Sequence, residues 1–231
     1  MQIHGLNKTT LLDYPEHVAA TIFTGGCNFC CPFCHNGELV LRPQEFPLLS
    51  EDEVLAFLKK RKGILTGVCI TGGEPTLQPD LPVFIERIKE MGYLVKLDTN
   101  GYRPGVLRTL LEKGLLDYAA MDIKSSKAGY ATAAGKENLD ITQIEESADI
   151  LKEGRIPYEF RTTVVKELHI KEDFIAVGEW LAGAEAYFLQ AYRDNENVIK
   201  KGFSSYSREE LEKFARILRR FIKRVELRGV E

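Results

Sequence analysis

Short apolar runs alternate along the chain with longer stretches of helical periodicity. Six runs rich in β-branched and aromatic residues predict strands, at residues 19–23, 68–71, 94–98, 118–123, 158–165 and 186–191. Between them, apolar residues recur every three or four positions, which predicts helices that each bury one face. These faces fall within residues 54–58, 84–88, 107–111, 144–151, 172–181 and 211–222.

Several predicted helices begin at recognisable caps. Ser50 with Glu53, and Ser207 with Glu210, have the spacing of capping boxes. Pro104 suits the first turn of a helix, where its missing N–H has no partner to lose.

Strands that alternate with helices indicate βα units and a parallel sheet. Eight such units would close a barrel of ~250 residues. Six units in 231 residues predict an α/β fold that forms a partial (β/α)6 TIM-like barrel of parallel strands. We expect a single domain over residues 1–231. A doubly wound open sheet is the alternative that the pattern leaves open.

Composition and charge narrow the class of protein. Hydrophobic residues make up 44% and charged residues 28% of the chain, as in soluble globular proteins. The net charge of −3 gives no broad attraction to nucleic acid or to membranes, so neither is expected as a partner. The apolar stretches are shorter than a bilayer span, and the N-terminus lacks the features of a secretory signal. The expected location is the cytoplasm.

Four of the five cysteines lie within eight residues, at Cys27, Cys30, Cys31 and Cys34. A secreted disulfide framework would spread an even number of cysteines along the chain, so this spacing favours metal binding. The fifth, Cys69, lies in an apolar run and is expected to be a buried small hydrophobic residue.

Cys27, Cys31 and Cys34 form a CxxxCxxC pattern directly after a predicted strand. Three thiolates from one loop can hold three irons of a [4Fe–4S] cluster and leave the fourth open for chemistry. One alternative is a structural zinc site made by these cysteines, or Cys30, with His35. Another is a four-cysteine electron-transfer cluster that includes Cys30, although neighbouring side chains in an extended loop point apart. Either alternative would make the chain a non-enzymatic zinc or iron–sulfur binding module.

Phe33, the aromatic residue just before the last cysteine, completes a pattern that resembles the signature of the radical S-adenosylmethionine (SAM) family. The continuation Cys34-His35-Asn36 and the opening at residues 5–15 resemble the activating enzymes of glycyl radical proteins. The strongest likeness is to the activating proteins of anaerobic ribonucleoside-triphosphate reductases, and it covers nearly the whole chain. That family often has a basic residue at the position of Cys30, so Cys30 is not expected to be a ligand.

The ends of the predicted strands carry further candidate groups, because sites in parallel βα folds collect there. The second predicted strand ends in Thr71-Gly72-Gly73-Glu74-Pro75. Paired glycines let a backbone approach a ligand closely, although by themselves they usually mark a turn. The resemblance implies that Gly72, Gly73 and Glu74 contact the amino group of SAM.

The next two predicted strands end in Asp98-Thr99-Asn100-Gly101 and Met121-Asp122-Ile123-Lys124. Two carboxylates and an ammonium at one rim could fix a zwitterion such as the methionine part of SAM, with Lys124 as partner of its carboxylate. The resemblance implies that Asp98, Thr99 and Asp122 form a monovalent cation site beside that carboxylate. An ordinary Asx turn is the alternative for the first of these motifs.

Arg161 interrupts an apolar strand, so its charge needs an anionic partner, either SAM or a carboxylate of the core. Gln190 and Arg193 fall near the position where the family places a residue beside the adenosine. Some activating enzymes have histidine there, whereas this chain has Tyr192-Arg193. The complete set of predicted cofactor contacts is Phe33, His35, Gly72, Gly73, Glu74, Asp98, Thr99, Asn100, Asp122, Lys124, Arg161 and Gln190.

The resemblance implies a reaction in which one electron from the reduced cluster splits SAM into methionine and a 5′-deoxyadenosyl radical. This radical would then remove a hydrogen from a glycine Cα of a partner glycyl radical enzyme. No side-chain acid or base is expected to be catalytic. Because the chain has no cysteines for further clusters, we expect a flavodoxin or ferredoxin to be the reductant. A radical SAM reaction on a small molecule or nucleobase precursor is the alternative activity.

Overall fold

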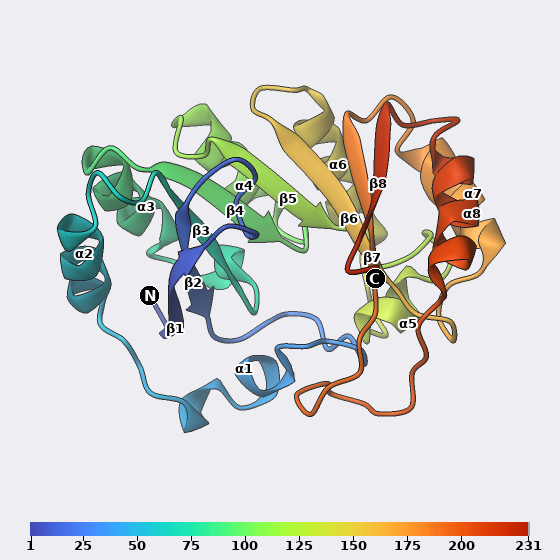
Figure 1. Ribbon diagram of the computed structural model, residues 1–231, viewed down its shortest axis with the longest axis horizontal. Helices are drawn as coiled ribbons and strands as arrows, with labels where there is room; N and C mark the ends of the chain where they lie inside the picture. The colour runs from blue at the N-terminus through green and yellow to red at the C-terminus, as the bar shows by residue number, and fades with distance from the viewer. Residues whose placement is uncertain (231) are drawn as a thin grey trace.

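The computed structural model describes residues 1–230, and its eight strands form one sheet whose order follows the chain from β1 to β8 (Figure 1). The six predicted strands are β2 (Ala19–Thr24), β3 (Gly67–Gly72), β4 (Leu94–Thr99), β5 (Tyr118–Asp122), β6 (Tyr158–Val164) and β7 (Ala186–Ala191). Each pairs in parallel with the next. A doubly wound sheet would reverse its strand order, so this arrangement excludes that alternative and confirms the partial barrel.

Two edge strands were not predicted from the sequence. β1 (Ile3–Thr10) is antiparallel to β2, and β8 (Arg224–Arg228) is parallel to β7. Only Ile3 and Thr10 are buried in β1, and only Val225 in β8, so neither strand has the apolar run of a central strand. They form the two ends of the sheet order, which leaves the barrel open.

Helices cover the outer, convex face of the sheet (Figure 1). The six predicted helices are α2 (Glu51–Lys60), α3 (Leu81–Glu90), α4 (Pro104–Glu112), α6 (Ile141–Lys152), α7 (Lys171–Trp180) and α8 (Arg208–Leu218). Both predicted capping boxes are present, at α2 and α8. Two short helices, α1 (Gly37–Leu41) and α5 (Tyr130–Ala134), were not predicted and follow the ends of β2 and β5 along the chain.

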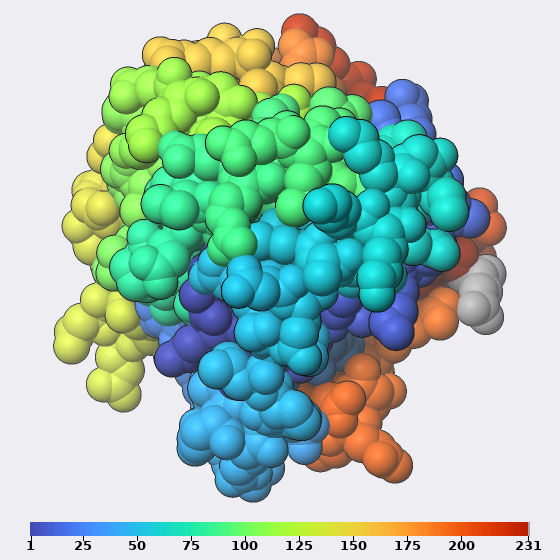
Figure 2. All heavy atoms as spheres, turned by 90° about the vertical axis from the view of Figure 1, so that its left-hand side faces the viewer, coloured from blue at the N-terminus to red at the C-terminus, as the bar shows by residue number. Residues whose placement is uncertain are grey.

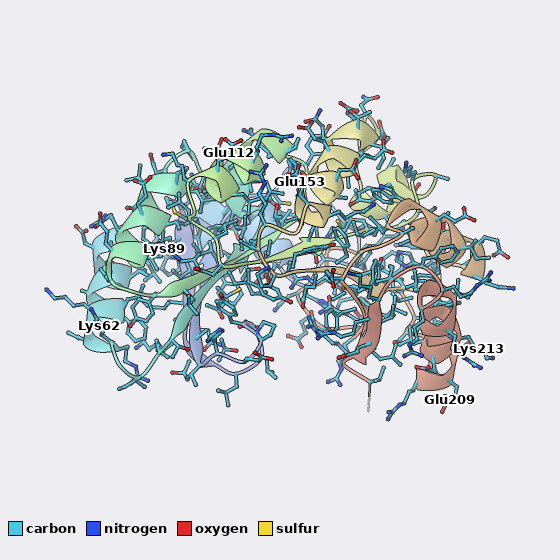
Figure 3. The ribbon with its side chains drawn as sticks, turned by 90° about the horizontal axis from the view of Figure 1, so that it is seen from above. Lys62, Lys89, Glu112, Glu153, Glu209 and Lys213 are labelled. Atoms are coloured by element: carbon cyan, nitrogen blue, oxygen red, sulfur yellow. The ribbon has the colours of Figure 1, made fainter. Side chains whose placement is uncertain are left out.

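The apolar core lies between the sheet and these helices. Figure 2 faces the side of α2, where the cyan and green parts of the chain form a continuous outer surface. Lys62, just after α2, and Lys213 of α8 project outward at the two sides of Figure 3. None of the helices within residues 1–230 is long and apolar enough to cross a membrane.

The two faces of a central strand differ in character. In β4, Val95 and Leu97 are fully buried hydrophobic residues, whereas Lys96 and Asp98 alternate with them and pair with each other. Since side chains alternate across a strand, the charged pair lies on the opposite, concave face. The inside of the open barrel is therefore polar, and the functional groups gather there.

Gly72 and Gly73 bring the end of β3 against the start of the loop that follows β2. The Gly73 N–H donates to the carbonyl of Thr24 at 2.8 Å, and the Glu74 N–H donates to the carbonyl of Gly26 at 2.8 Å. A Cβ on Gly73 would lie 1.9 Å from the Gly26 oxygen, and Gly72 has a φ of +112°. These glycines therefore make room for neighbouring backbone, and the close approach to a ligand expected from the sequence stays a prediction.

We predict that Gly73→Ala destabilises the protein by about 1–3 kcal/mol, because the new methyl group overlaps a backbone oxygen that cannot move freely. Chemical denaturation of the metal-free protein would measure this loss. Gly105→Ala is the matched control, since nothing lies within 4 Å of a Cβ on this exposed residue of α4. Equal stability of the two variants would contradict the prediction.

Candidate functional site

One cavity of about 430 Å³ opens among the carboxyl ends of the central strands. Its size is within the range of ~300–1,000 Å³ that is usual for small-molecule sites. The three cysteines of the CxxxCxxC pattern and all twelve predicted cofactor contacts line it. The tertiary structure thus brings together groups from five strand ends and from the cysteine loop.

The cysteine loop presents three of its four thiols to this cavity. Cys31 is buried, Cys27 and Cys34 are partly buried, and Cys30 is exposed and outside the cavity lining. The Cys30 N–H donates to the carbonyl of Ala134 at 2.9 Å, which holds the loop against α5. The orientation expected for adjacent cysteines is therefore observed, with one side chain inward and its neighbour outward.

The thiols are protonated in the metal-free protein. Burial raises the pKa of Cys27 to about 12 and that of Cys31 to about 11, and it also raises the pKa of Cys34. Two donors already face the Cys27 sulfur, the Phe29 N–H at 3.4 Å and the Asn100 amide at 3.7 Å. Such donors stabilise a thiolate. When a metal binds and the thiol proton is released, the resulting thiolate would already have hydrogen-bond donors beside it.

The donor set fits a cluster with one open iron. Three thiols line one cavity, and the other two cysteines, Cys30 and Cys69, do not. Within residues 1–230, no three His, Cys, Asp or Glu side chains are arranged to hold a single metal ion. A mononuclear zinc site therefore has no ready ligand group in this part of the chain. Thiolates of an iron–sulfur cluster need no common centre, because each binds a different iron.

Glu74 ties the loop after β3 to the loop after β4. Its carboxylate is 1% exposed and accepts hydrogen bonds from the Thr76 N–H at 3.1 Å, the Thr99 hydroxyl at 2.8 Å and the Asn100 N–H at 2.7 Å. Burial raises the pKa of Glu74, although these donors oppose the shift. The observed role of this side chain is to hold protein groups in place, and its contact with SAM stays a prediction.

Five charged side chains form a continuous chain across the concave face. Lys96 contacts one oxygen of Asp98, and Arg161 donates to the other at 3.0 Å. Arg161 also pairs through its Nε with Asp122, whose second oxygen lies 3.1 Å from the ammonium of Lys124. The anionic partner that Arg161 needed is therefore supplied by core carboxylates.

These contacts keep the groups ionised despite burial. Burial by itself would raise the pKa of Asp98 and of Asp122, but the charges of the neighbouring cations outweigh it and hold both pKa values below the usual range. Burial would lower the pKa of Lys124, yet Asp122 raises it above the ordinary lysine value. Lys124 keeps a positive charge at neutral pH and has three donors, of which Asp122 uses one.

His169 fixes the backbone at Lys124. Its Nδ1 accepts from the Val165 N–H at 3.0 Å, so its Nε2 carries the proton and donates to the Lys124 carbonyl at 2.7 Å. Burial lowers the pKa of this histidine, which favours the neutral ring that both hydrogen bonds require. No role was predicted for His169 from the sequence, since its partner Lys124 is remote along the chain.

At the other end of the cavity, the His35 ring stacks on Tyr192 with centroids 5.6 Å apart. Its Nε2 lies 2.6 Å from the carbonyl of Arg193. His35 and Gln190 also line an adjoining cavity of about 270 Å³. This end thus offers a flat aromatic surface and an amide, next to the cysteine loop.

Four residues that bear on the site were not predicted as site residues, although Asn36 stands in the Cys34-His35-Asn36 motif. Asp13 and Thr163 line the cavity, and so does Asn36, whose amide donates to the Gly72 carbonyl at 2.8 Å. Lys96 lies beneath the cavity, with its ammonium 3.8 Å from the sulfur of the buried Cys69. The available signal for Lys96 was a charged residue within an apolar strand, the same signal that identified Arg161.

Comparison with known proteins gives consistent matches. The family model described as "Radical SAM superfamily" matches residues 21–180. A protein of Methanocaldococcus jannaschii described as "Putative glycyl-radical enzyme activating enzyme" is 30% identical over 99% of this chain and 96% of its own length. The 7-carboxy-7-deazaguanine synthase of Neisseria meningitidis serogroup B is 29% identical over 58% of this chain and 56% of its own length.

Solved structures share the fold. A domain of the pyruvate-formate lyase-activating enzyme from Bacteroides vulgatus superposes with a TM-score of 0.58 and 21% identity, covering 71% of this chain and 99% of that one. SuiB of Streptococcus suis bound to S-adenosylmethionine gives a TM-score of 0.69 at 16% identity, covering 88% of this chain and 48% of that one.

The positions of the cysteines lead to a direct prediction. After anaerobic reconstitution, Cys31→Ala should lose bound iron and the absorbance of an iron–sulfur cluster, because it removes a thiol of the cavity wall. Cys30→Ser should retain both, since this side chain is exposed and outside the cavity. Iron analysis and the visible spectrum measure the difference. The opposite behaviour of the two variants would overturn the choice of ligands.

Proposed function

Because the chain belongs to the radical SAM superfamily, we propose that it is an activating enzyme that generates a glycyl radical on a partner protein. Cys27, Cys31 and Cys34 would hold the [4Fe–4S] cluster, and SAM would occupy the remaining cavity. When bound, the cluster and SAM supply the one-electron cleavage that yields the 5′-deoxyadenosyl radical. The protein's own residues position SAM and keep water from the reacting atoms.

The charged end of the cavity suits the methionine part of SAM. Lys124 has free donors for a carboxylate, and its charge is held in place by Asp122. The network from Lys96 to Lys124 contains three cations and two carboxylates, so it favours an additional negative group. Gly72, Gly73 and Glu74 lie on the wall where the amino group of SAM is expected.

The opposite end suits the adenosine part. Gln190 offers an amide there, and His35 and Tyr192 form a stacked pair beside it. We propose that Phe33 and His35 pack near the adenine, with Asn100 contributing at the cysteine side. These assignments follow from position within the cavity and from the family to which the chain belongs.

The choice of a protein substrate is supported by the full-length similarity to the Methanocaldococcus jannaschii relative, whose printed description is an activating enzyme. This match spans 99% of the chain, whereas the match to the deazaguanine synthase spans 58%. The open edge between β1 and β8 adds to this support. Two further cavities share His35 with the central one, and together they would accommodate an extended loop from a macromolecule.

We further propose that a flavodoxin or ferredoxin in the cytoplasm supplies the electron, because no cysteine outside the cavity wall is placed to carry a second cluster. The basic residues at the end of the last helix and in the segment after it do not identify the docking site of the reductant, because they have partners within the protein. Arg219 pairs with Glu212, Lys223 with Glu185 and Arg224 with Glu226. These pairs give the end of α8 and the segment after it the character of a solvated surface.

The proposed activity is tested with the reconstituted protein, SAM, a reductant and a glycyl radical enzyme from the same genome. We expect a glycyl radical signal in electron paramagnetic resonance spectra, together with one 5′-deoxyadenosine per radical. Deuterium at the glycine Cα should appear in the 5′-deoxyadenosine. A partner with alanine in place of the radical glycine is the control.

The other outcomes separate the alternatives. SAM cleavage without a radical on any partner would favour a small-molecule or nucleobase-precursor substrate, as the similarity to the deazaguanine synthase allows. Protein that binds no iron, or that binds a cluster but does not cleave SAM, would favour a binding module and overturn the proposal.

We predict that Lys124→Ala weakens SAM binding by about tenfold or more, the usual effect of losing a charge-assisted hydrogen bond. The iron content should stay at the wild-type level, because Lys124 is not a thiol ligand. Calorimetry on the reconstituted protein measures the affinity. Lys127→Ala is the matched control, since this exposed lysine pairs with Glu145 away from the cavity. Unchanged affinity in Lys124→Ala would remove this residue from the SAM site.

A further inference from the structure

The resemblance assigns a monovalent cation to Asp98, Thr99 and Asp122, and the structure allows this assignment to be examined. A hard cation binds to oxygen atoms that carry negative charge. Each of the two carboxylates already contacts two cationic side chains. Asp98 lies between Lys96 and Arg161, and Asp122 lies between Arg161 and Lys124.

The remaining oxygen of the expected site is also engaged. The Thr99 hydroxyl donates to Glu74 at 2.8 Å and accepts from the Gly101 N–H at 3.1 Å. The donor set therefore does not fit a bound cation, because an ion at this position would lie among three fixed positive charges. Asp13, another carboxylate of the cavity wall, accepts from the hydroxyl of Thr21.

Lys96 is the member of this network that does not reach the cavity. Its side chain is 2% exposed and lies two positions before Asp98 on the same face of β4. Its ammonium contacts Asp98 and lies 3.8 Å from the sulfur of Cys69, so the charge is fixed beneath the carboxylate. Its positive charge therefore acts on Asp98 without occupying the cavity.

We infer that Lys96 supplies, as a built-in ammonium, the positive charge that a monovalent cation would bring to Asp98, so that SAM binding needs neither Na⁺ nor K⁺. Lys96 is then a positioning residue, which acts on the ligand through Asp98 and Arg161. This inference rests on the proposed function, because it concerns the SAM site of that activity.

The first test uses the reconstituted wild-type protein and measures SAM affinity by calorimetry in chloride salts of K⁺, Na⁺ and tetramethylammonium at equal ionic strength. We expect dissociation constants that agree within about twofold, since screening is then the same in all three salts. A dissociation constant at least tenfold lower in K⁺ or Na⁺ would overturn the inference but leave the proposed function intact. Failure to bind SAM in every salt would overturn the proposed function, and the inference with it.

The second test uses Lys96→Met, which keeps the length of the side chain and removes its charge. In tetramethylammonium chloride, SAM affinity should fall by about tenfold, the usual effect of losing one charged contact. K⁺ or Na⁺ should restore most of it, because the Asp98 oxygen that Lys96 contacted has then lost its cationic partner and can accept the ion. An equal loss of affinity in all three salts would overturn the inference, since simple structural damage gives that pattern.

Lys89→Met is the matched control. Lys89 lies on α3, pairs with Asp117 at 2.6 Å and is not part of the cavity lining (Figure 3). Its substitution should leave SAM affinity independent of the cation. If Lys96→Met does not fold, the salt series on the wild-type protein still decides the question.

Discussion

The polar interior of this open barrel is stabilised by buried side chains of opposite charge that neutralise one another. Removing an ion from water costs several kcal/mol unless a partner of opposite charge compensates for it. Asp98 and Asp122 each have two cationic partners, and Arg161 bridges them from the neighbouring strand. Since the partners come from β4, β5, β6 and the loop after β5, the network also links the strands that carry the site.

A second set of contacts joins the loops at the strand ends. The glycine pair after β3 lies on the backbone at the start of the cysteine loop, and Glu74 binds the loop after β4. Asn100, from that loop, reaches back to the sulfur of Cys27. The three loops thus support one another, which keeps the thiols and the charged network at a fixed separation. A radical reaction requires such positioning, because the protein contributes geometry and the cofactors contribute the chemistry.

Much of the polar network is structural in the absence of any ligand. Glu74 and Arg161 were predicted as ligand contacts, and both bind protein groups, while their contact with a ligand stays a prediction. The groups that they hold, such as Asn100 and Asp122, also line the cavity. A substitution at Glu74 or Arg161 would also displace these neighbours, so a loss of function would reflect their arrangement.

The sequence by itself determined the types of the central strands and main helices, and it identified most of the residues that line the cavity. Apolar runs and caps mark the central strands and helices, and the CxxxCxxC spacing marks the three thiols that face the cavity. The edge strands β1 and β8 escaped prediction because an edge strand buries too few side chains to give a periodic pattern. Only the tertiary structure decided which charged side chains form ion pairs, because these side chains lie on three strands, at Lys96, Asp98, Asp122 and Arg161. Their contacts depend on strand register, and register is a property of the assembled sheet.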